Sequence, residues 1–228
     1  MLRCLSVIRS LSVPNPTRRA WLFIVAGTVA VFAALFLKLA DSVRESDFVV
    51  RFDQHTLTFV TDHRVAWISR VARVVTLFGS AWVVTVVIIG AATVLIRRRR
   101  YLDTLFVSLS SIGTAILVAT TKHIIGRPRP AAPDRLVAAS GTAFPSGHAA
   151  QSVACYAALA VVTVLASRST KIRVLAWFAA VTVALSVGVS RVYLGVHWPS
   201  DVFSGWLLAA GWLLTLIGVR LALSPRPA

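Results

Sequence analysis

The chain has 228 residues, of which 57% are hydrophobic and only 14% charged, a composition too apolar for an ordinary soluble domain. Its formal net charge of +16 is compatible with nucleic-acid binding, but the Lys and Arg residues are spread around the apolar segments on both sides. We therefore assign the chain to the integral membrane class and expect no nucleic-acid partner.

Six apolar segments approach the roughly 20 residues that a helix needs to cross a bilayer. They predict membrane-spanning helices at residues 21–37, 74–96, 104–121, 149–166, 174–189 and 202–219. No cleavable signal peptide is evident before the first segment, so we expect this segment to be retained as a span. The predicted fold is an all-α, six-helix transmembrane bundle that forms a single domain over residues 1–228.

The connection between the first two predicted spans, residues 41–73, is the longest in the chain and mixes charged with apolar residues. Apolar side chains recur in it at helical spacing, at Val65, Ile68, Val71 and Ala72. This pattern predicts an interfacial amphipathic helix that leads into the second span. His55 and His63 lie here without a constellation around them, and we interpret both as surface residues.

Four consecutive arginines, residues 97–100, occupy the short loop after the second predicted span. Because short cytoplasmic loops carry an excess of Lys and Arg, the run predicts that this loop and both termini are cytoplasmic. Cys4 lies in the amino-terminal tail and Cys155 inside the fourth predicted span, at different depths. These two cysteines predict neither a disulfide nor a metal site.

Alternating spans bring three polar segments to one side of the bundle, with the sequences KHIIGRPRP, PSGH and SRVYLGVHWPSD. Lys122, Arg129 and Arg191 supply fixed positive charge in them, and guanidinium groups bind phosphate oxygens through paired hydrogen bonds. The Ser146 hydroxyl and the backbone N–H groups around Gly147 lie at a predicted helix start, where unpaired donors and the helix dipole favour an anion. The expected ligand is therefore a phosphate group.

Besides His123, the same segments contain His148 and His197, which are the candidates for proton and phosphoryl transfer. Asp201 follows His197 by four residues, a spacing that brings a carboxylate to an imidazole on a helical turn and fixes its tautomer. With a phosphoryl group between the two rings, one ring can attack while the other protonates the leaving oxygen. This chemistry needs neither a metal nor another cofactor, and the residues alone leave open which histidine attacks.

The three segments resemble the signatures of the type-2 phosphatidic acid phosphatase superfamily: Lys-x6-Arg-Pro, Pro-Ser-Gly-His and Ser-Arg-x5-His-x3-Asp. Every motif position is filled, within residues 122–201. The resemblance implies that His197 is the nucleophile that forms a phosphohistidine, that Asp201 orients it, and that His148 is the general acid. It also implies that the substrate phosphate is bound by Lys122, Arg129, Ser146, Gly147, Ser190 and Arg191. His123, Arg127 and Arg135 lie outside the motifs and are further candidates for contacts with the phosphate or the lipid headgroup.

By resemblance, we expect a metal-independent membrane phosphatase that removes a terminal phosphate from a lipid phosphate or diphosphate at the outer membrane face. Undecaprenyl or another polyprenyl diphosphate is the favoured substrate, with phosphatidylglycerol phosphate and phosphatidic acid as alternatives. A lipid phosphotransferase stays open, because water and an alcohol acceptor differ only in access. A transporter also stays open, since it too can place Arg and His between spans. The expected partners are the lipid substrate and the surrounding membrane lipids.

Overall fold

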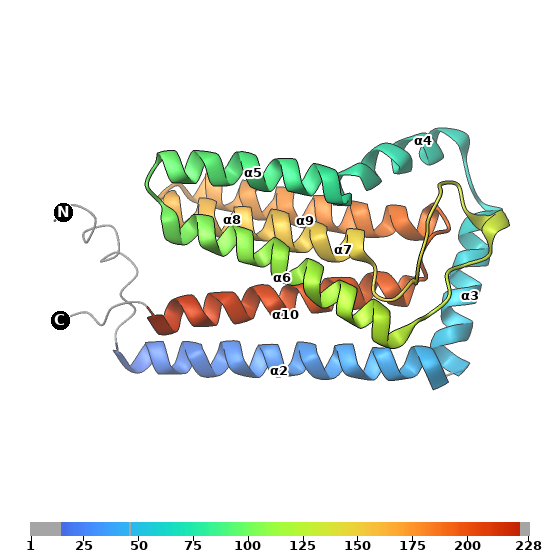
Figure 1. The fold of residues 1–228 in the computed structure, drawn as a ribbon, viewed down its shortest axis with the longest axis horizontal. Coiled ribbons are helices and arrows are strands. Elements are labelled where there is room, and N and C mark those ends of the chain that lie inside the picture. The colour runs from blue at the N-terminus through green and yellow to red at the C-terminus, as the bar shows by residue number, and fades with distance from the viewer. Residues whose placement is uncertain (1–14, 46, 224–228) are drawn as a thin grey trace.

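The computed structural model describes residues 15–45 and 47–223, and within these ranges it contains helices and no strands (Figure 1). The elements are α2 (Asn15–Glu45), α3 (Asp47–Asp62), α4 (Ala66–Val75), the 3-10 turn η2 (Thr76–Gly79), α5 (Ala81–Arg97), α6 (Tyr101–Ile125), the 3-10 turn η3 (Ala132–Asp134), α7 (Gly147–Ser152), the π-helical turn η4 (Val153–Ala157), α8 (Ala158–Ala166), α9 (Thr170–Tyr193) and α10 (Pro199–Leu223). The all-α prediction is confirmed. Residues 1–14, which include Cys4, and residues 224–228 lie outside the described ranges. The single domain over residues 1–228 therefore stays a prediction.

Within residues 15–45 and 47–223, five helices are long and apolar enough to cross a membrane: α2, α6, the continuous helix Gly147–Ala166, α9 and α10. A sixth crossing results if α4 with η2 and α5 count as one span bent by 49°. The predicted second span, residues 74–96, begins before this bend and ends after it. The chain is therefore a multi-pass membrane protein, as predicted, with a broken second span.

The long helices run roughly along one common direction (Figure 1). α2 lies along α10, and α6 contacts both α10 and α5. In the middle of the bundle, Val118 packs against the small residues Ala150, Ala154 and Ala209. Small side chains let neighbouring backbones approach closely, which is how helices in lipid gain packing energy.

α3 lies across one end of this bundle, next to the loop between α6 and α7 (Figure 1). The predicted amphipathic segment is thus two helices, α3 and α4, separated by a break at residues 63–65. Of the apolar residues expected on one face of the segment, Ala72 is buried in the protein while Val65 and Val71 are exposed, so the interfacial placement stays a prediction. His55 and His63 are both exposed, as expected.

The loop between α6 and α7 is fixed to the bundle by apolar contacts and by hydrogen bonds. Phe144, which is fully buried, packs against Ala40 and Val43 near the end of α2. Arg64, just before α4, donates to the backbone oxygen of Asp134 at 2.7 Å and to that of Tyr193 at 3.1 Å. These contacts hold the loop against the end of α9.

A buried carboxylate links two segments at the opposite end of the bundle. Asp103, in the first turn of α6, accepts a hydrogen bond of 2.6 Å from Arg100 and another of 2.6 Å from Arg220 on α10. Arg100 is the last residue of the four-arginine run. One of the four arginines therefore donates a hydrogen bond within the fold, besides adding to the positive charge of the loop.

α10 approaches the start of α7 closely at Gly205. A Cβ atom there would lie 2.6 Å from the backbone oxygen of Ser146 and 3.2 Å from the backbone nitrogen of Ala150. The backbone N–H of Ser146 also donates to the backbone oxygen of Asp201 at 2.8 Å. The first turns of α7 and α10 are therefore fixed side by side, which requires glycine at position 205.

We expect Gly205→Ala to destabilise the protein by about 1–3 kcal/mol, because the added methyl group must push α10 away from the α7 backbone. The matched control is Gly90→Ala on α5, where a Cβ atom meets nothing within 4 Å. Ala is favoured over Gly inside a helix by roughly 0.5–1 kcal/mol, so this control should be neutral or stabilising. Unfolding in detergent micelles measures both variants. Equal stability of the two would contradict the close approach.

Candidate active site

The three motif segments meet at the end of the bundle where α3 lies. They comprise the carboxyl end of α6 and the loop that follows it, the amino end of α7, and the turn between α9 and α10 (Figure 1). Lys122, Arg129, Arg191 and His197 all lie close enough to His148 to interact with it electrostatically. The structure thus gathers the predicted cations and both histidines in one place.

His197 is buried, with 2% of its surface exposed, and contacts a group through each ring nitrogen. Nδ1 lies 3.3 Å from Oδ2 of Asp201, and Nη1 of Arg129 lies 3.0 Å from Nε2. Because a carboxylate accepts and a guanidinium donates, these contacts assign the proton to Nδ1 and the lone pair to Nε2. Burial lowers the pKa of His197 to about 4, against the opposing effect of Asp201. The ring is therefore neutral at pH 7 and carries its lone pair on Nε2.

The turn that carries His197 needs glycine at position 195. Gly195 has a φ of +73°, and a Cβ atom there would clash with the backbone oxygen of Asp134. Leu194 and Val196, on either side of it, are fully buried and pack with Ala72 of α4. This packing fixes the backbone from which the His197 ring projects.

Two buried polar atoms of the motif residues have no hydrogen-bond partner within the described part of the chain: Oγ of Ser146 and Nε of Arg191. Ser146 is the N-cap of α7, yet its hydroxyl makes no capping bond. Nη1 of Arg191 donates to Oγ1 of Thr76 at 2.8 Å, which holds the guanidinium in place. A buried donor without a partner costs roughly 1–3 kcal/mol, so this pair fits a site that receives oxygen atoms from a ligand.

Lys122 and Arg129 contact the backbone of the loop between α6 and α7. The Lys122 ammonium donates to the backbone oxygens of Thr142 and Ala143. Nε of Arg129 donates to the backbone oxygen of Gly141 at 3.0 Å, while Nη1 reaches His197. Both cations are thus oriented by neutral carbonyl groups, and no carboxylate in the described part of the chain is hydrogen-bonded to either of them.

The remaining candidates, Ser190, Gly147 and His148, differ in their contacts and in their exposure. The Ser190 hydroxyl donates to the backbone oxygen of Val187 at 2.6 Å, within its own helix. Gly147 has room around it, since a Cβ atom would make only an ordinary contact of 3.6 Å with Val118. His148, in the first turn of α7, is partly exposed.

The expected phosphate contacts outside the motifs are not supported by the geometry. Arg135 donates to the backbone oxygens of Pro130 and Ala139. Arg127 donates to two buried carboxylates instead of facing the site as a free cation. His123 is exposed on α6. Among the described residues, Lys122, Arg129 and Arg191 thus stay the candidate cations for phosphate binding.

Sequence reasoning missed two residues that support this site, Thr76 and Asp53. Thr76 lies in the bend of the second span and binds Arg191, and no sequence pattern points to it. Asp53 of α3 contacts Arg127 at 2.7 Å. A signal for Asp53 existed, because it lies one turn before Leu57 on the buried face of α3, where a carboxylate is unexpected.

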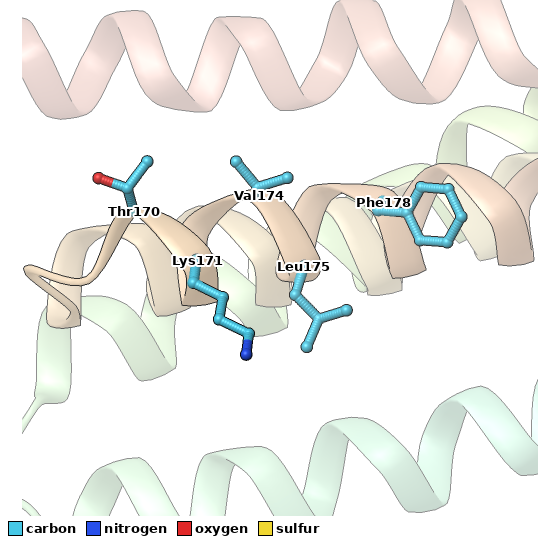
Figure 2. Close-up of a pocket in the computed structure, with 5 residues that line it drawn as sticks. All are labelled: Thr170, Lys171, Val174, Leu175 and Phe178. Atoms are coloured by element: carbon cyan, nitrogen blue, oxygen red, sulfur yellow. The ribbon is translucent and has the colours of Figure 1, made fainter.

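A shallow hollow of about 370 Å³ lies far from these residues, on the first turns of α9 at the opposite end of the bundle. Figure 2 shows that Lys171 and Leu175 project from one side of α9 and that Thr170 and Val174 project from the other. Its walls are almost entirely apolar, and it contains no pair of titratable groups. We interpret the hollow as part of the lipid-facing surface.

Comparison with known proteins gives one consistent result. The family profile of the PAP2 superfamily matches residues 103–223. The chain is 32% identical over 148 residues to phosphatidylglycerophosphatase B of Bacillus subtilis (strain 168), which covers 64% of this chain and 71% of that protein. It is 32% identical over 107 residues to undecaprenyl-diphosphatase of Sulfolobus acidocaldarius, covering 45% and 48% of the two chains. The fold is similar to the crystal structure of a transmembrane PAP2-type phosphatidylglycerolphosphate phosphatase from Bacillus subtilis, with a TM-score of 0.81, 26% identity, and coverage of 86% of this chain and 97% of that one.

Proposed function

Because this chain belongs to the PAP2 superfamily, we propose that it releases the terminal phosphate of a membrane lipid through a phosphohistidine at His197. It is a membrane phosphatase, of a family whose members are in general metal-independent. The observation that carries the proposal is the buried ring of His197, with Nδ1 toward Asp201, at the same end of the bundle as two buried donors, Oγ of Ser146 and Nε of Arg191, that find no partner in residues 15–45 and 47–223. A nucleophile and unused phosphate ligands thus lie together at one end of the bundle.

In the first step, the oxygens of the terminal phosphate accept hydrogen bonds from Ser146, Lys122 and Arg191. Nη1 of Arg129 moves from Nε2 of His197 to a phosphate oxygen, which frees the lone pair. Binding of the anionic phosphate among these cations lets His148 take up a proton. Nε2 then attacks phosphorus, the bond from phosphorus to the lipid oxygen breaks, and the His148 imidazolium donates this proton to that oxygen. Asp201 keeps the proton on Nδ1 and stabilises the positive charge that the ring acquires.

In the second step, a water molecule replaces the lipid alcohol. The neutral ring of His148 accepts a proton from this water as its oxygen attacks phosphorus. The bond from phosphorus to Nε2 breaks, its electron pair returns to Nε2, and inorganic phosphate leaves. His148 is again protonated and His197 again neutral, so the cycle closes without a cofactor.

For the lipid, we infer phosphatidylglycerol phosphate as the first candidate. The phosphatidylglycerophosphatase is matched over the larger share of its length, 71% against 48% for the undecaprenyl-diphosphatase. In the described residues, Arg127 is paired with carboxylates and Arg135 with carbonyl groups, so neither is free for a second phosphate. This preference replaces the expectation of a polyprenyl diphosphate, which the Sulfolobus relative supports as the second candidate.

We expect the purified protein to release inorganic phosphate from phosphatidylglycerol phosphate faster than from a polyprenyl diphosphate or phosphatidic acid. Release should persist in EDTA, because cationic side chains bind the phosphate, and vanadate should inhibit it as a phosphate mimic. The measurement is kcat/KM for each lipid in detergent, with His197→Ala as the inactive control. A strict requirement for Mg²⁺, or no release from any of these lipids, would refute the proposal. Transfer of phosphate to an added lipid alcohol without release would identify the phosphotransferase alternative.

The covalent intermediate is expected to be trapped on His197. Radiolabelled substrate followed by an alkaline quench should label the wild type and not His197→Gln, because phosphohistidine survives in base. His148→Gln should slow phosphate release from phosphatidylglycerol phosphate by about 10²–10⁴-fold, since its alkoxide leaving group needs a proton. A smaller loss is expected on a diphosphate, whose leaving group is already a stable anion. Label retained in folded His197→Gln would place the nucleophile elsewhere.

We further propose that the site lies on the outer side of the membrane and that both termini are cytoplasmic. The support is that the arginine run, residues 97–100, lies at the end of the bundle opposite to the site (Figure 1). In a background without Cys4 and Cys155, cysteines introduced as Ala131→Cys and Arg98→Cys should react differently with an impermeant thiol reagent on intact cells. Both positions are exposed, and only the first should be labelled from outside. The reverse pattern would invert the proposed topology.

A further inference from the structure

Arg127 lies two residues before the motif arginine, yet its guanidinium is held between two carboxylates. Nη1 donates to Oδ1 of Asp201 at 2.7 Å, and Nη2 donates to Oδ2 of Asp53 at 2.7 Å. Arg127 is 8% exposed, and both aspartates are 0% exposed. The three charged groups therefore form one buried chain that ends at the carboxylate facing His197.

Ser200 joins this chain from the first turn of α10. Its hydroxyl accepts a hydrogen bond of 2.7 Å from Arg127 and donates to Oδ2 of Asp53. Its backbone N–H donates to Oδ1 of Asp53 at 2.9 Å. Asp53 is thereby bound to the residue immediately before Asp201, and α3 is fixed to the helix turn that carries the catalytic carboxylate.

We propose that Asp53 and Arg127 are positioning residues for phosphoryl transfer, which hold Asp201 with Oδ2 toward Nδ1 of His197 and preserve its negative charge. This inference rests on the proposed function of the same site. Neither residue touches the reacting atoms: Asp53 acts through Arg127, and Arg127 acts through Asp201.

The charge balance explains why the second carboxylate is needed. Arg127 and Asp201 alone would form a neutral ion pair, and Asp201 would then stabilise a positive ring on His197 only weakly. Asp53 shares the guanidinium, so the three groups together carry one net negative charge next to the imidazole. A buried charge left without its partner is strongly destabilising, so Asp53, Arg127 and Asp201 depend on one another for stability.

The geometry also explains why position 127 requires arginine. The planar guanidinium directs separate N–H groups to Asp53, Ser200 and Asp201 and lies over the Trp198 ring with its carbon 5.5 Å from the ring centroid. A lysine ammonium is a point charge and cannot reproduce this fork. Arg127→Lys should therefore resemble a loss of positioning although the charge is kept.

Asp53 comes from a part of the chain that the family profile does not cover, since the match begins at residue 103. It is carried by α3, which lies across the end of the bundle where the site is found (Figure 1). The segment between the first two spans thus supplies a group to the catalytic charge network.

Asp53→Asn is the direct test, with Asp62→Asn as the matched control, because Asp62 is exposed on the same helix. We expect Asp53→Asn to lower kcat by about 10–100-fold, as is typical when an outer partner of a functional group is lost. The KM should change by no more than about twofold, because the phosphate ligands are intact. Asp62→Asn should match the wild type. A raised KM with normal kcat would place Asp53 and Arg127 in substrate binding and overturn the inference, as would wild-type kinetics.

Coupling to Asp201 separates positioning from a general loss of stability. If Asp53 acts through Asp201, then Asp53→Asn added to Asp201→Asn should cost little beyond Asp201→Asn alone. Independent roles would instead give losses that multiply. Arg127→Lys in the same two backgrounds should behave like Asp53→Asn. Multiplied losses in both cases would overturn the inference.

A spectroscopic measurement tests the inference without turnover. In ligand-free protein at neutral pH, ¹⁵N NMR of the His197 ring, assigned by comparison with His197→Gln, reports which nitrogen carries the proton. Asp53→Asn should increase the fraction protonated at Nε2, because Asp201 is less firmly oriented, while Asp62→Asn should not. If the wild type hydrolyses no lipid phosphate, the proposed function fails and this measurement still decides the positioning role. An unchanged tautomer in Asp53→Asn would overturn it.

Discussion

The fully buried carboxylate of Asp201 is the group around which the site is organised, because a negative charge removed from water must be surrounded by donors. Its donors come from separate segments: Arg127 from the loop after α6, and His197 with the Trp198 backbone N–H from the turn before α10. Its backbone oxygen accepts from the N–H of Ser146 at the start of α7. The carboxylate and the backbone oxygen of this one residue thus bring three distant parts of the sequence to the same place.

Hydropathy and motif spacing predicted the helical bundle and the end at which the polar segments meet. They did not predict that the second span is broken, because hydropathy records how apolar a segment is and not where its axis bends. The partners Thr76 and Asp53 were also missed, since a hydrogen bond between residues over 70 positions apart leaves no local pattern in one sequence. Arg127 was noticed, but its charge alone suggested phosphate and not a carboxylate partner.

Ser190 and Arg191 illustrate a limit of reading motifs as sets of equivalent ligands. Neighbouring residues on an α-helix project about 100° apart, so two adjacent side chains rarely face one ligand together. Here the Ser190 hydroxyl donates to Val187 of its own helix. Arg191 donates to Thr76, and its Nε has no hydrogen-bond partner among the residues that the structure describes. The two neighbours therefore differ in what they offer to a phosphate, although the motif treats them alike.

The contact of α2 with the bundle has a consequence for how such sequences diverge. None of its most apolar stretch is buried, and it lies mainly along α10. Lipid tails accept any apolar side chain, so substitutions there are constrained by hydropathy and hardly by shape. Substitutions of this kind keep the helix apolar while its residue identities change, so we expect α2 to be less informative in sequence comparison than α3, whose Asp53 carboxylate is held by specific partners.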